Sequence, residues 1–152
     1  MGCGSSDRCL LKIHVVKATE LPNMDVRPTV DAYVKVTYNG NSQKTEVVKS
    51  SNNPSFNHTM VWEGAEKGGI ITFEVWDWDR LTANDLIGSY RQPTDLLQDN
   101  ETKLLDLELQ GTKEKGRLFV NIRFIRIPNG DMNEHKYEDP ENIPPNKTDD
   151  EK

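Results

Sequence analysis

Carboxylates gather in two separated segments of the sequence, and each segment stands where a hydrophobic run ends. The first, LPNMDVRPTVDAYVKV, holds two aspartates and the second, VWDWDRLTANDLIG, holds three: Asp25, Asp31, Asp77, Asp79 and Asp85. Five carboxylates brought together by two loops would repel one another without cations between them. Hard divalent cations with many oxygen ligands, calcium above all, are the usual partners of such a cluster. The pattern therefore predicts a calcium site at one edge of a β domain.

The elements that must position these loops are short strands. Apolar and polar residues alternate in several of the runs, and turn signals such as Asn39-Gly40, Gly68-Gly69 and Gly111 separate them. The predicted strands cover residues 10–16, 31–38, 43–49, 56–62, 69–77, 86–93, 103–109 and 116–125. No long helical pattern occurs, although residues 94–99 have room for one helical turn. We expect an all-β fold, an eight-stranded antiparallel β-sandwich.

Length and charge divide the chain into three parts. Its 152 residues suit about one domain, and the formal net charge is −6. Residues 128–152 hold eight acidic side chains and three lysines, a net of −5, which leaves −1 for the other residues. We expect a flexible leader at 1–9, a folded domain at 10–127 and an acidic disordered tail at 128–152. Two bound calcium ions would make the near-neutral domain basic around its loops, which favours anionic lipid over nucleic acid.

The two cysteines, Cys3 and Cys9, stand close together near the start of the chain. A bridge between them would close a tiny loop, so we expect no structural disulfide. No apolar stretch approaches the ~20 residues that span a bilayer, and no signal-peptide core follows the first methionine. We therefore expect the protein on the cytoplasmic side of a membrane.

The predicted domain resembles the C2 domain of protein kinase C and synaptotagmin over roughly residues 10–127. The resemblance rests on several elements in order: a strand running into LPNMD, a second aspartate followed by AYVKV, then NNPSFN, and DWDRLTAND followed by LIG. The start of the chain, without an extra leading strand, is similar to the type II topology of this family. That topology places both termini at the end of the sandwich opposite the loops.

The resemblance implies two or three Ca²⁺ ions, held in a cup between two loops. The five aspartates named above match the family's ligands, main-chain carbonyls at Met24 and Trp78 complete the shell, and Thr82 matches a position that assists a further ion. A C2 fold can also lose calcium and keep its shape, and aspartates crowd turns for local reasons. A structural or protein-docking domain therefore stays open as an alternative.

Membrane contact is implied by position. Val26 and Leu81 match residues that insert between lipid headgroups, with Arg27 and Arg80 beside them for phosphate. A second lipid site of the family, a lysine-rich groove, is represented by three lysines on the matching strands: Lys35, Lys44 and Lys49. Three scattered lysines also suit an ordinary solvated face.

The leader MGCGSS fits an acylation signal. Gly2 would accept myristate after removal of the methionine, with Ser6 at the required position, and Cys3 stands where palmitate is commonly added. One myristoyl chain anchors a protein only marginally, so the second group would make the anchor stable. Because the anchor and the loops would lie at opposite ends, the domain must lie on its side or bridge two membranes.

Catalysis is not expected. The histidines, His14, His58 and His135, fall in strands or in the tail, and no nucleophile elbow, phosphate-binding loop or zinc spacing occurs. We expect a monomeric, lipid-anchored peripheral protein whose C2 domain binds anionic phospholipid when calcium is present, in membrane signalling or trafficking. The alternative is a calcium-independent, membrane-anchored scaffold that docks other proteins through its body or its tail.

Overall fold

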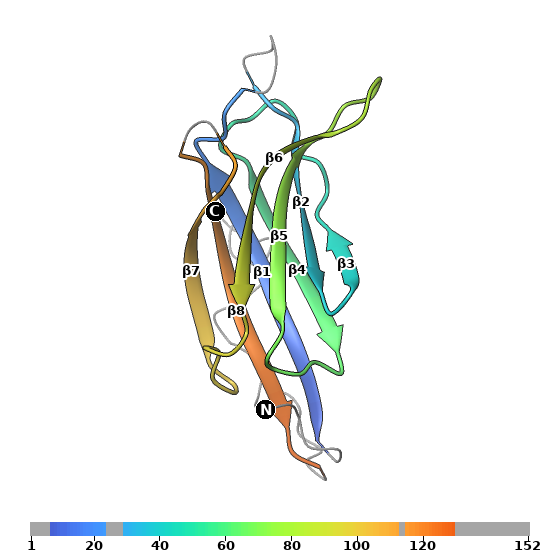
Figure 1. Cartoon of the computed structure of the whole chain (residues 1–152), viewed down its shortest axis with the longest axis vertical. Coiled ribbons are helices and arrows are strands. Elements are labelled where there is room, and N and C mark those ends of the chain that lie inside the picture. Colours follow the sequence, from blue (N-terminus) through green and yellow to red (C-terminus); the bar gives the residue numbers. More distant parts are fainter. Residues whose placement is uncertain (1–6, 24–28, 113–114, 130–152) are drawn as a thin grey trace, which may run out of the picture.

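Two four-stranded antiparallel sheets pack face to face in the computed structural model, which describes residues 7–23, 29–112 and 115–129 (Figure 1). One sheet, here called the β1 sheet, has the order β4-β1-β8-β7, and the other, the β2 sheet, has the order β3-β2-β5-β6. The strands are β1 (Arg8–Thr19), β2 (Ala32–Tyr38), β3 (Asn41–Lys44), β4 (Ser55–Glu63), β5 (Ile70–Asp77), β6 (Asp85–Pro93), β7 (Thr102–Glu108) and β8 (Arg117–Ile127). The prediction of an eight-stranded antiparallel sandwich is confirmed.

Alternation along the strands builds the core between the sheets. In β1, Leu11, Ile13 and Val15 are fully buried, and in β5, Phe73 and Val75 face them from the other sheet. Successive side chains of a strand point to opposite faces, so these residues share the inner face. The core therefore follows directly from the apolar period of the sequence.

Two strands, β1 and β3, depart from their predicted bounds by more than two residues at one end. β1 runs on to Thr19, because a bulge between Val15 and Lys17 shifts the alternation that the sequence pattern relied on. β3 ends at Lys44. After it, the Thr45 N–H still donates to the Val34 carbonyl of β2 at 2.9 Å, and Val48 forms an isolated bridge with Ala32. The segment 94–99 forms no helix, and one hydrogen bond from the Leu97 N–H to the Thr94 carbonyl closes a turn there.

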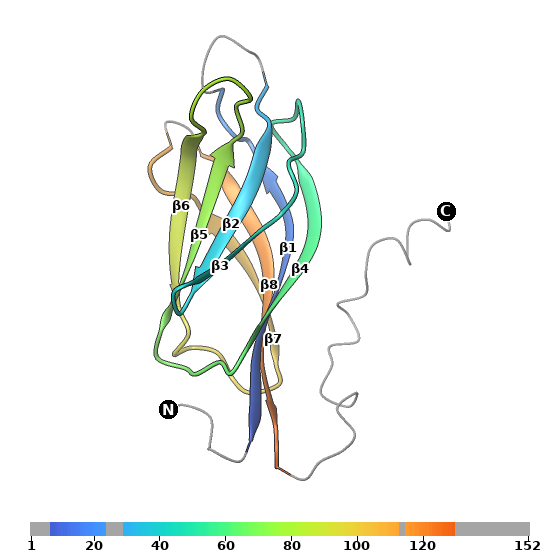
Figure 2. The ribbon, with the colours of Figure 1, turned by 90° about the vertical axis from the view of Figure 1, so that its right-hand side faces the viewer.

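β1 lies in the centre of its sheet, between β4 and β8, and no strand precedes it within the described residues. Arg8, the first residue of β1, pairs with Ile127, the last residue of β8. β1 therefore begins, and β8 ends, at the same end of the sandwich, here called the termini end (Figure 2). This arrangement agrees with the type II topology. No helix long and apolar enough to cross a membrane occurs in the described parts of the chain.

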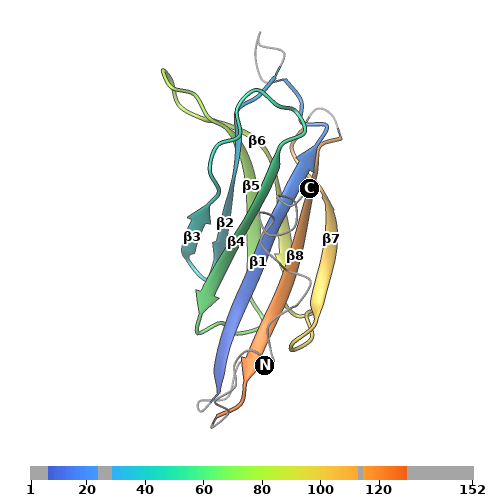
Figure 3. The same cartoon turned by 180° about the vertical axis from the view of Figure 1, so that it is seen from behind.

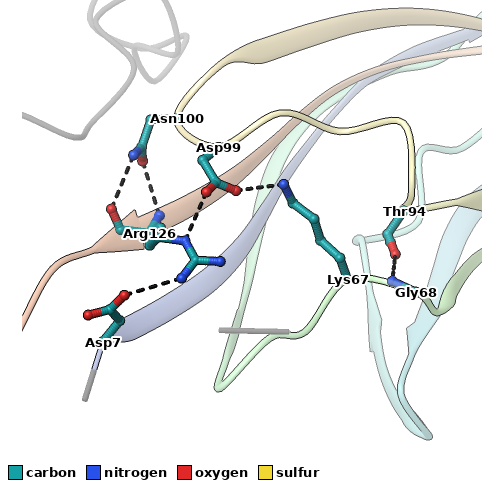
Figure 4. A network of polar contacts seen from close by, with 7 residues as sticks. All are labelled: Asp7, Lys67, Gly68, Thr94, Asp99, Asn100 and Arg126. Atoms are coloured by element: carbon teal, nitrogen blue, oxygen red, sulfur yellow. Dashed lines mark hydrogen bonds and ion pairs between the residues drawn. The ribbon is translucent and has the colours of Figure 1, made fainter. Parts of the chain in front are cut away.

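A network of ion pairs ties the termini end together (Figure 4). The Arg126 guanidinium contacts Asp99 at 2.8 Å and Asp7 at 3.2 Å, and Lys67 contacts the second oxygen of Asp99 at 2.6 Å. Burial alone would raise the pKa of Asp99, but hydrogen bonds from Lys67 and Arg126 outweigh it and lower that pKa. Ion pairs thus connect the start of β1, the end of β8, the β4–β5 loop and the β6–β7 loop.

Cys9 is disulfide-bonded in the structure, so the prediction that no disulfide forms was wrong. The chain's other cysteine, Cys3, lies outside the described residues. The prediction rested on how little so small a loop would stabilise the fold. Closing a short loop nevertheless orders few residues, so a small stabilising effect does not prevent such a bond from forming.

Candidate calcium and membrane site

Three aspartates lie at the ends of three neighbouring strands of the β2 sheet. Asp31 directly precedes β2, Asp77 is the last residue of β5, and Asp85 is the first residue of β6. Asp77 pairs in register with Asp85 on one side, and its other neighbour is Ala32, the residue after Asp31. These aspartates therefore lie at one end of the sandwich, here called the loop end, opposite the termini end (Figure 1).

Main-chain hydrogen bonds hold the two most buried carboxylates. Asp77 is 2% exposed, and its Oδ1 accepts a hydrogen bond from the Asp31 N–H at 3.0 Å. Oδ1 of Asp31, which is 9% exposed, accepts one from the Ser50 N–H at 2.8 Å. The Trp78 N–H donates to the Asp31 carbonyl at 2.7 Å, so both segments are also joined through their backbones. Buried carboxylates normally require such donors or a cation.

Asp79 shapes the β5–β6 loop from within. Its Oδ1 accepts hydrogen bonds from the N–H groups of Leu81 at 2.8 Å and Thr82 at 3.2 Å. An aspartate that bonds to the backbone two and three residues on forms a local turn. The Thr82 hydroxyl, in turn, contacts the Ala83 carbonyl at 3.4 Å. In this arrangement Oδ1 of Asp79 stabilises the backbone of its own loop.

Asn84 is a positioning residue that the sequence reasoning missed. Its Oδ1 accepts a hydrogen bond from the Asp79 N–H at 2.9 Å, and its amide donates to the Tyr33 hydroxyl at 2.9 Å. Asn84 thus fastens the loop to β2. The preference of asparagine for turns was the available signal, but the partner on β2, far away in the sequence, could not be read from it.

The donor chemistry of this end fits a calcium ion. Four aspartates from two segments lie at this end, and carboxylate oxygens are the donors that a hard cation prefers. Asp25 and Met24, the remaining proposed ligands, lie outside the described residues. Among the residues that the structure does describe, no group of three or more acidic, histidine or cysteine side chains is arranged so that it could hold a metal ion.

The residues proposed for membrane contact are described only on the second loop. Leu81 is 85% exposed, and Arg80 beside it is also exposed. Val26 and Arg27 lie outside the described residues, as do the acylation residues Gly2 and Cys3. The β5–β6 loop therefore presents an apolar side chain to solvent beside the aspartates.

The structure brings two of the three proposed basic residues together. Lys35 and Lys44 are directly opposite each other on β2 and β3, and both line a shallow hollow with Tyr33 and Trp76. Nζ of Lys44 lies 5.8 Å from the centre of the Tyr33 ring. Lys49 lies apart from this hollow, with its Nζ 5.0 Å from the centre of the Trp78 ring, next to the aspartates. Lys49 thus belongs to the loop end.

The two four-stranded sheets and the acidic loop end define a β-sandwich module of the kind that carries its site on loops at one end. The chain belongs to the C2 domain family, whose model matches residues 9–109.

Several relatives share this domain but are longer proteins. Ras GTPase-activating protein 4 of Mus musculus is 40% identical over 80 residues, which cover 51% of this chain and 10% of that protein. Synaptotagmin-1 of Aplysia californica is 30% identical over 128 residues, which cover 76% of this chain and 30% of that protein. The chain thus spans less than a third of the length of these relatives.

Solved structures show the same fold. A C2 domain of plant extended synaptotagmin 1 matches with a TM-score of 0.71 and 24% identity, covering 80% of this chain and 96% of that one. A calcium-bound pair of C2 domains from extended synaptotagmin 2 matches with a TM-score of 0.68 and 19% identity, covering 76% of this chain and 45% of that one. Likeness at this identity concerns the architecture alone.

Proposed function

We propose that this chain binds anionic phospholipid membranes through its loop end and that calcium controls this binding. The observation that carries the proposal is the position of Asp31, Asp77 and Asp85 at the ends of three adjacent strands. Asp31 and Asp77 are nearly buried, and ionised carboxylates that lie so close together repel one another. A bound calcium ion supplies positive charge there and open coordination positions for lipid phosphate. Two or three ions are the expected number.

The chain's own residues would perform the rest of the work. The four described aspartates, with Asp25, Thr82 and the carbonyls of Met24 and Trp78, would hold the ions. Leu81, with Val26, would enter the headgroup layer, and Arg80, with Arg27, would contact phosphates. Neutralising the acidic end removes the repulsion between these carboxylates and an anionic surface. Lipid binding and calcium binding would then reinforce each other, because each favours the same occupied state.

Sedimentation with liposomes tests this proposal. Unacylated full-length protein should pellet with phosphatidylserine vesicles in calcium and stay in the supernatant with a chelator. The double variant Asp77→Asn with Asp79→Asn should stay in the supernatant under both conditions. Pelleting that is independent of calcium and survives the double substitution would contradict the mechanism. Neutral phosphatidylcholine vesicles are the matched control, since they lack the anionic headgroup.

A second candidate is a calcium-independent scaffold that docks other proteins. The observation that favours it is Asp79, whose Oδ1 bonds to its own loop and so explains that aspartate without a metal. Calorimetric titration distinguishes the two functions. Heat of binding at up to millimolar calcium supports the calcium site, and its absence supports the scaffold. For either function we propose a binding module without catalytic activity.

We further propose that Gly2 carries myristate and Cys3 palmitate, which would hold the protein on the cytoplasmic face of a membrane. The disulfide bond at Cys9 bears on this proposal, because a sulfur in a disulfide cannot also carry a thioester. Mass spectrometry of protein isolated from cells without reducing agent decides between the two states. An acyl mass on the peptide that contains Gly2 and Cys3 supports the anchor. A cross-link between that peptide and the Cys9 peptide contradicts palmitoylation of Cys3.

A further inference from the structure

The β1 sheet carries a buried apolar patch on the face that points away from the core. Leu11, Ile13 and Val15 point into the core, so Leu10 points to the opposite face, here called the outer face. Ile125 pairs directly with Leu10, and Ile127 follows on the same face of β8. These three residues form an apolar cluster separate from the core, at the termini end.

The three side chains of this patch are nearly inaccessible to solvent. Leu10 is 9% exposed, Ile125 7% and Ile127 6%, although they face away from the other sheet. Figure 3 looks onto the outer face, and no strand or loop of the described chain lies over it. Other apolar side chains on exposed faces of this domain remain open to solvent, for example Leu104 at 67%. The patch is therefore far more buried than such side chains are elsewhere on the outside of the domain.

The residues that follow β8 are placed to cover this patch. β8 ends at Ile127, within the patch itself, and is followed by Pro128, Asn129 and Gly130. Proline followed by asparagine and glycine is a strong turn signal, which reverses the chain within a few residues. The Asn129 N–H donates a hydrogen bond to Oδ1 of Asp7 at 3.1 Å, so the start of this turn is already fixed to the domain.

The outer face also suits the tail by shape and charge. Farther along it, a shallow apolar hollow is lined by residues that include Val16, Lys17, Leu104 and Phe119. Alternation and pairing place five basic residues (Arg8, Lys12, Lys17, Arg117, Arg123) and three acidic ones (Glu63, Asp106, Glu108) on this face, a net of +2. Residues 128–152 carry a net of −5, from eight acidic residues and three lysines.

The distances allow the contact. Phe119 stands eight residues before Ile127 in β8, which corresponds to about 26 Å along the strand. The 23 residues after Asn129 can span about 75 Å when extended, so the tail reaches the hollow with length to spare. Its few apolar side chains are Met132, Tyr137 and Ile143. Met132 follows the turn directly and is the nearest apolar residue in sequence to the patch.

We propose that the tail folds back onto the outer face of the β1 sheet. Met132 covers Leu10, Ile125 and Ile127, and the acidic segment that follows runs along the basic face towards the hollow at Leu104 and Phe119. The outer face is thus the docking surface of the chain's own tail. This contact needs neither calcium nor lipid.

Cleavage of the full-length protein by chymotrypsin at Tyr137, in chelator and without lipid, tests the proposal. The site should be cut about tenfold more slowly than in a free peptide of residues 128–152, because a contact of about 1.4 kcal/mol protects that much. Lys12→Glu with Lys17→Glu should restore the rate of the free peptide, as should a rise to about 1 M salt, which screens the attraction. Lys35→Glu with Lys44→Glu, on the other sheet, is the matched control and should leave the protection unchanged.

Methyl NMR of the same protein identifies what covers the patch. Met132→Asp should shift the methyl signals of Leu10, Ile125 and Ile127 and leave those of Val34 and Val36 in the β2 sheet in place. If these signals do not respond to Met132→Asp, another segment covers the patch and the proposal is wrong. Cleavage at the rate of the free peptide would also overturn it. Protection that falls on tenfold dilution would assign the contact to a second copy of the chain instead.

Discussion

The backbone N–H of Asp31 donates a hydrogen bond to Oδ1 of Asp77, which joins two loops that stand 46 residues apart in the sequence. Through this contact the start of β2 and the end of β5 share one carboxylate. Asparagine at position 77 would keep the acceptor oxygen and lose the charge. The fold and the proposed calcium affinity can therefore be tested separately at this residue.

Asp77→Asn should weaken calcium binding by at least about tenfold and leave the melting temperature within a few degrees of the wild type. Its amide oxygen still accepts the bond from Asp31, but a neutral ligand contributes less to holding a divalent cation. Titration calorimetry and thermal unfolding in chelator are the two measurements. Glu101→Gln, at the termini end, should change neither quantity. Wild-type calcium affinity in Asp77→Asn would remove this residue from the site.

Leu81→Ala should reduce partitioning onto phosphatidylserine vesicles about tenfold in calcium, because less apolar surface would enter the headgroup layer. Calcium affinity without lipid should not change, since no main-chain ligand is altered. Leu96→Ala is the control, because Leu96 is 67% exposed at the opposite end of the domain. Equal losses in the two variants would show that the membrane does not distinguish the two ends.

Folding stability should fall as the pH is lowered from about 7 to about 5, because of His14. Burial lowers the pKa of His14, and the nearby charges of Lys12 and His58 lower it further, against the opposing effect of a hydrogen bond from His14 to Asn57. The unfolded chain therefore takes up the proton first, so stability is present above the ordinary pKa of about 6.5 and is lost as the pH falls towards the lowered value.

Urea unfolding midpoints over this pH range measure the effect. In His14→Gln the contribution of His14 to the pH dependence of stability should disappear. The glutamine side chain can still contact the Thr59 hydroxyl, which lies 2.8 Å from Nδ1 of His14 in the wild type. His58→Gln, on β4, is the comparison variant and should retain the contribution of His14. A pH profile that is the same in wild type and His14→Gln would contradict the assignment.

Gly88→Ala should destabilise the domain by about 1–3 kcal/mol through overpacking. A Cβ atom at Gly88 would lie 2.6 Å from Cγ2 of Thr112 and 3.0 Å from the Gln110 carbonyl oxygen. That segment pairs antiparallel with β6, since Gln110 and Ser89 exchange both backbone hydrogen bonds, so it has little freedom to withdraw. Ser89→Ala, which keeps these backbone bonds, should cost much less. Equal denaturant midpoints for the two variants would show that the segment at Gln110 and Thr112 moves away from β6 to make room.

The sequence allowed the positions of Asp31, Asp77 and Asp85 to be predicted because strand ends and residue types are local properties. The loop geometry between them was not predictable, since it depends on the contact between Asn84 and Tyr33 across 51 residues. The bulge between Val15 and Lys17 was not predictable either, because the type of the extra residue does not mark a bulge and only the alternation is broken.

The outer-face patch illustrates a different limit. Leu10, Ile125 and Ile127 are apolar and lie in or beside predicted strands, but the apolar runs LLKI and FIRI do not show which residue faces away from the core. Only the register between β1 and β8 separates them from Leu11 and Phe124. The charge network around Arg126 was unpredictable for the same reason, since Asp7 and Asp99 are distant in sequence.

The pairing of Arg8 with Ile127 has a mechanical consequence. A force applied between the two ends of the described chain would separate β1 from β8, starting at this pair. The hydrogen bonds between the two strands would then break one after another, because the force acts along them. A force between the loop end and the termini end would instead act along the strands and load many of these bonds at once. The domain should therefore resist tension from a membrane held at its loops far better than tension between its own termini.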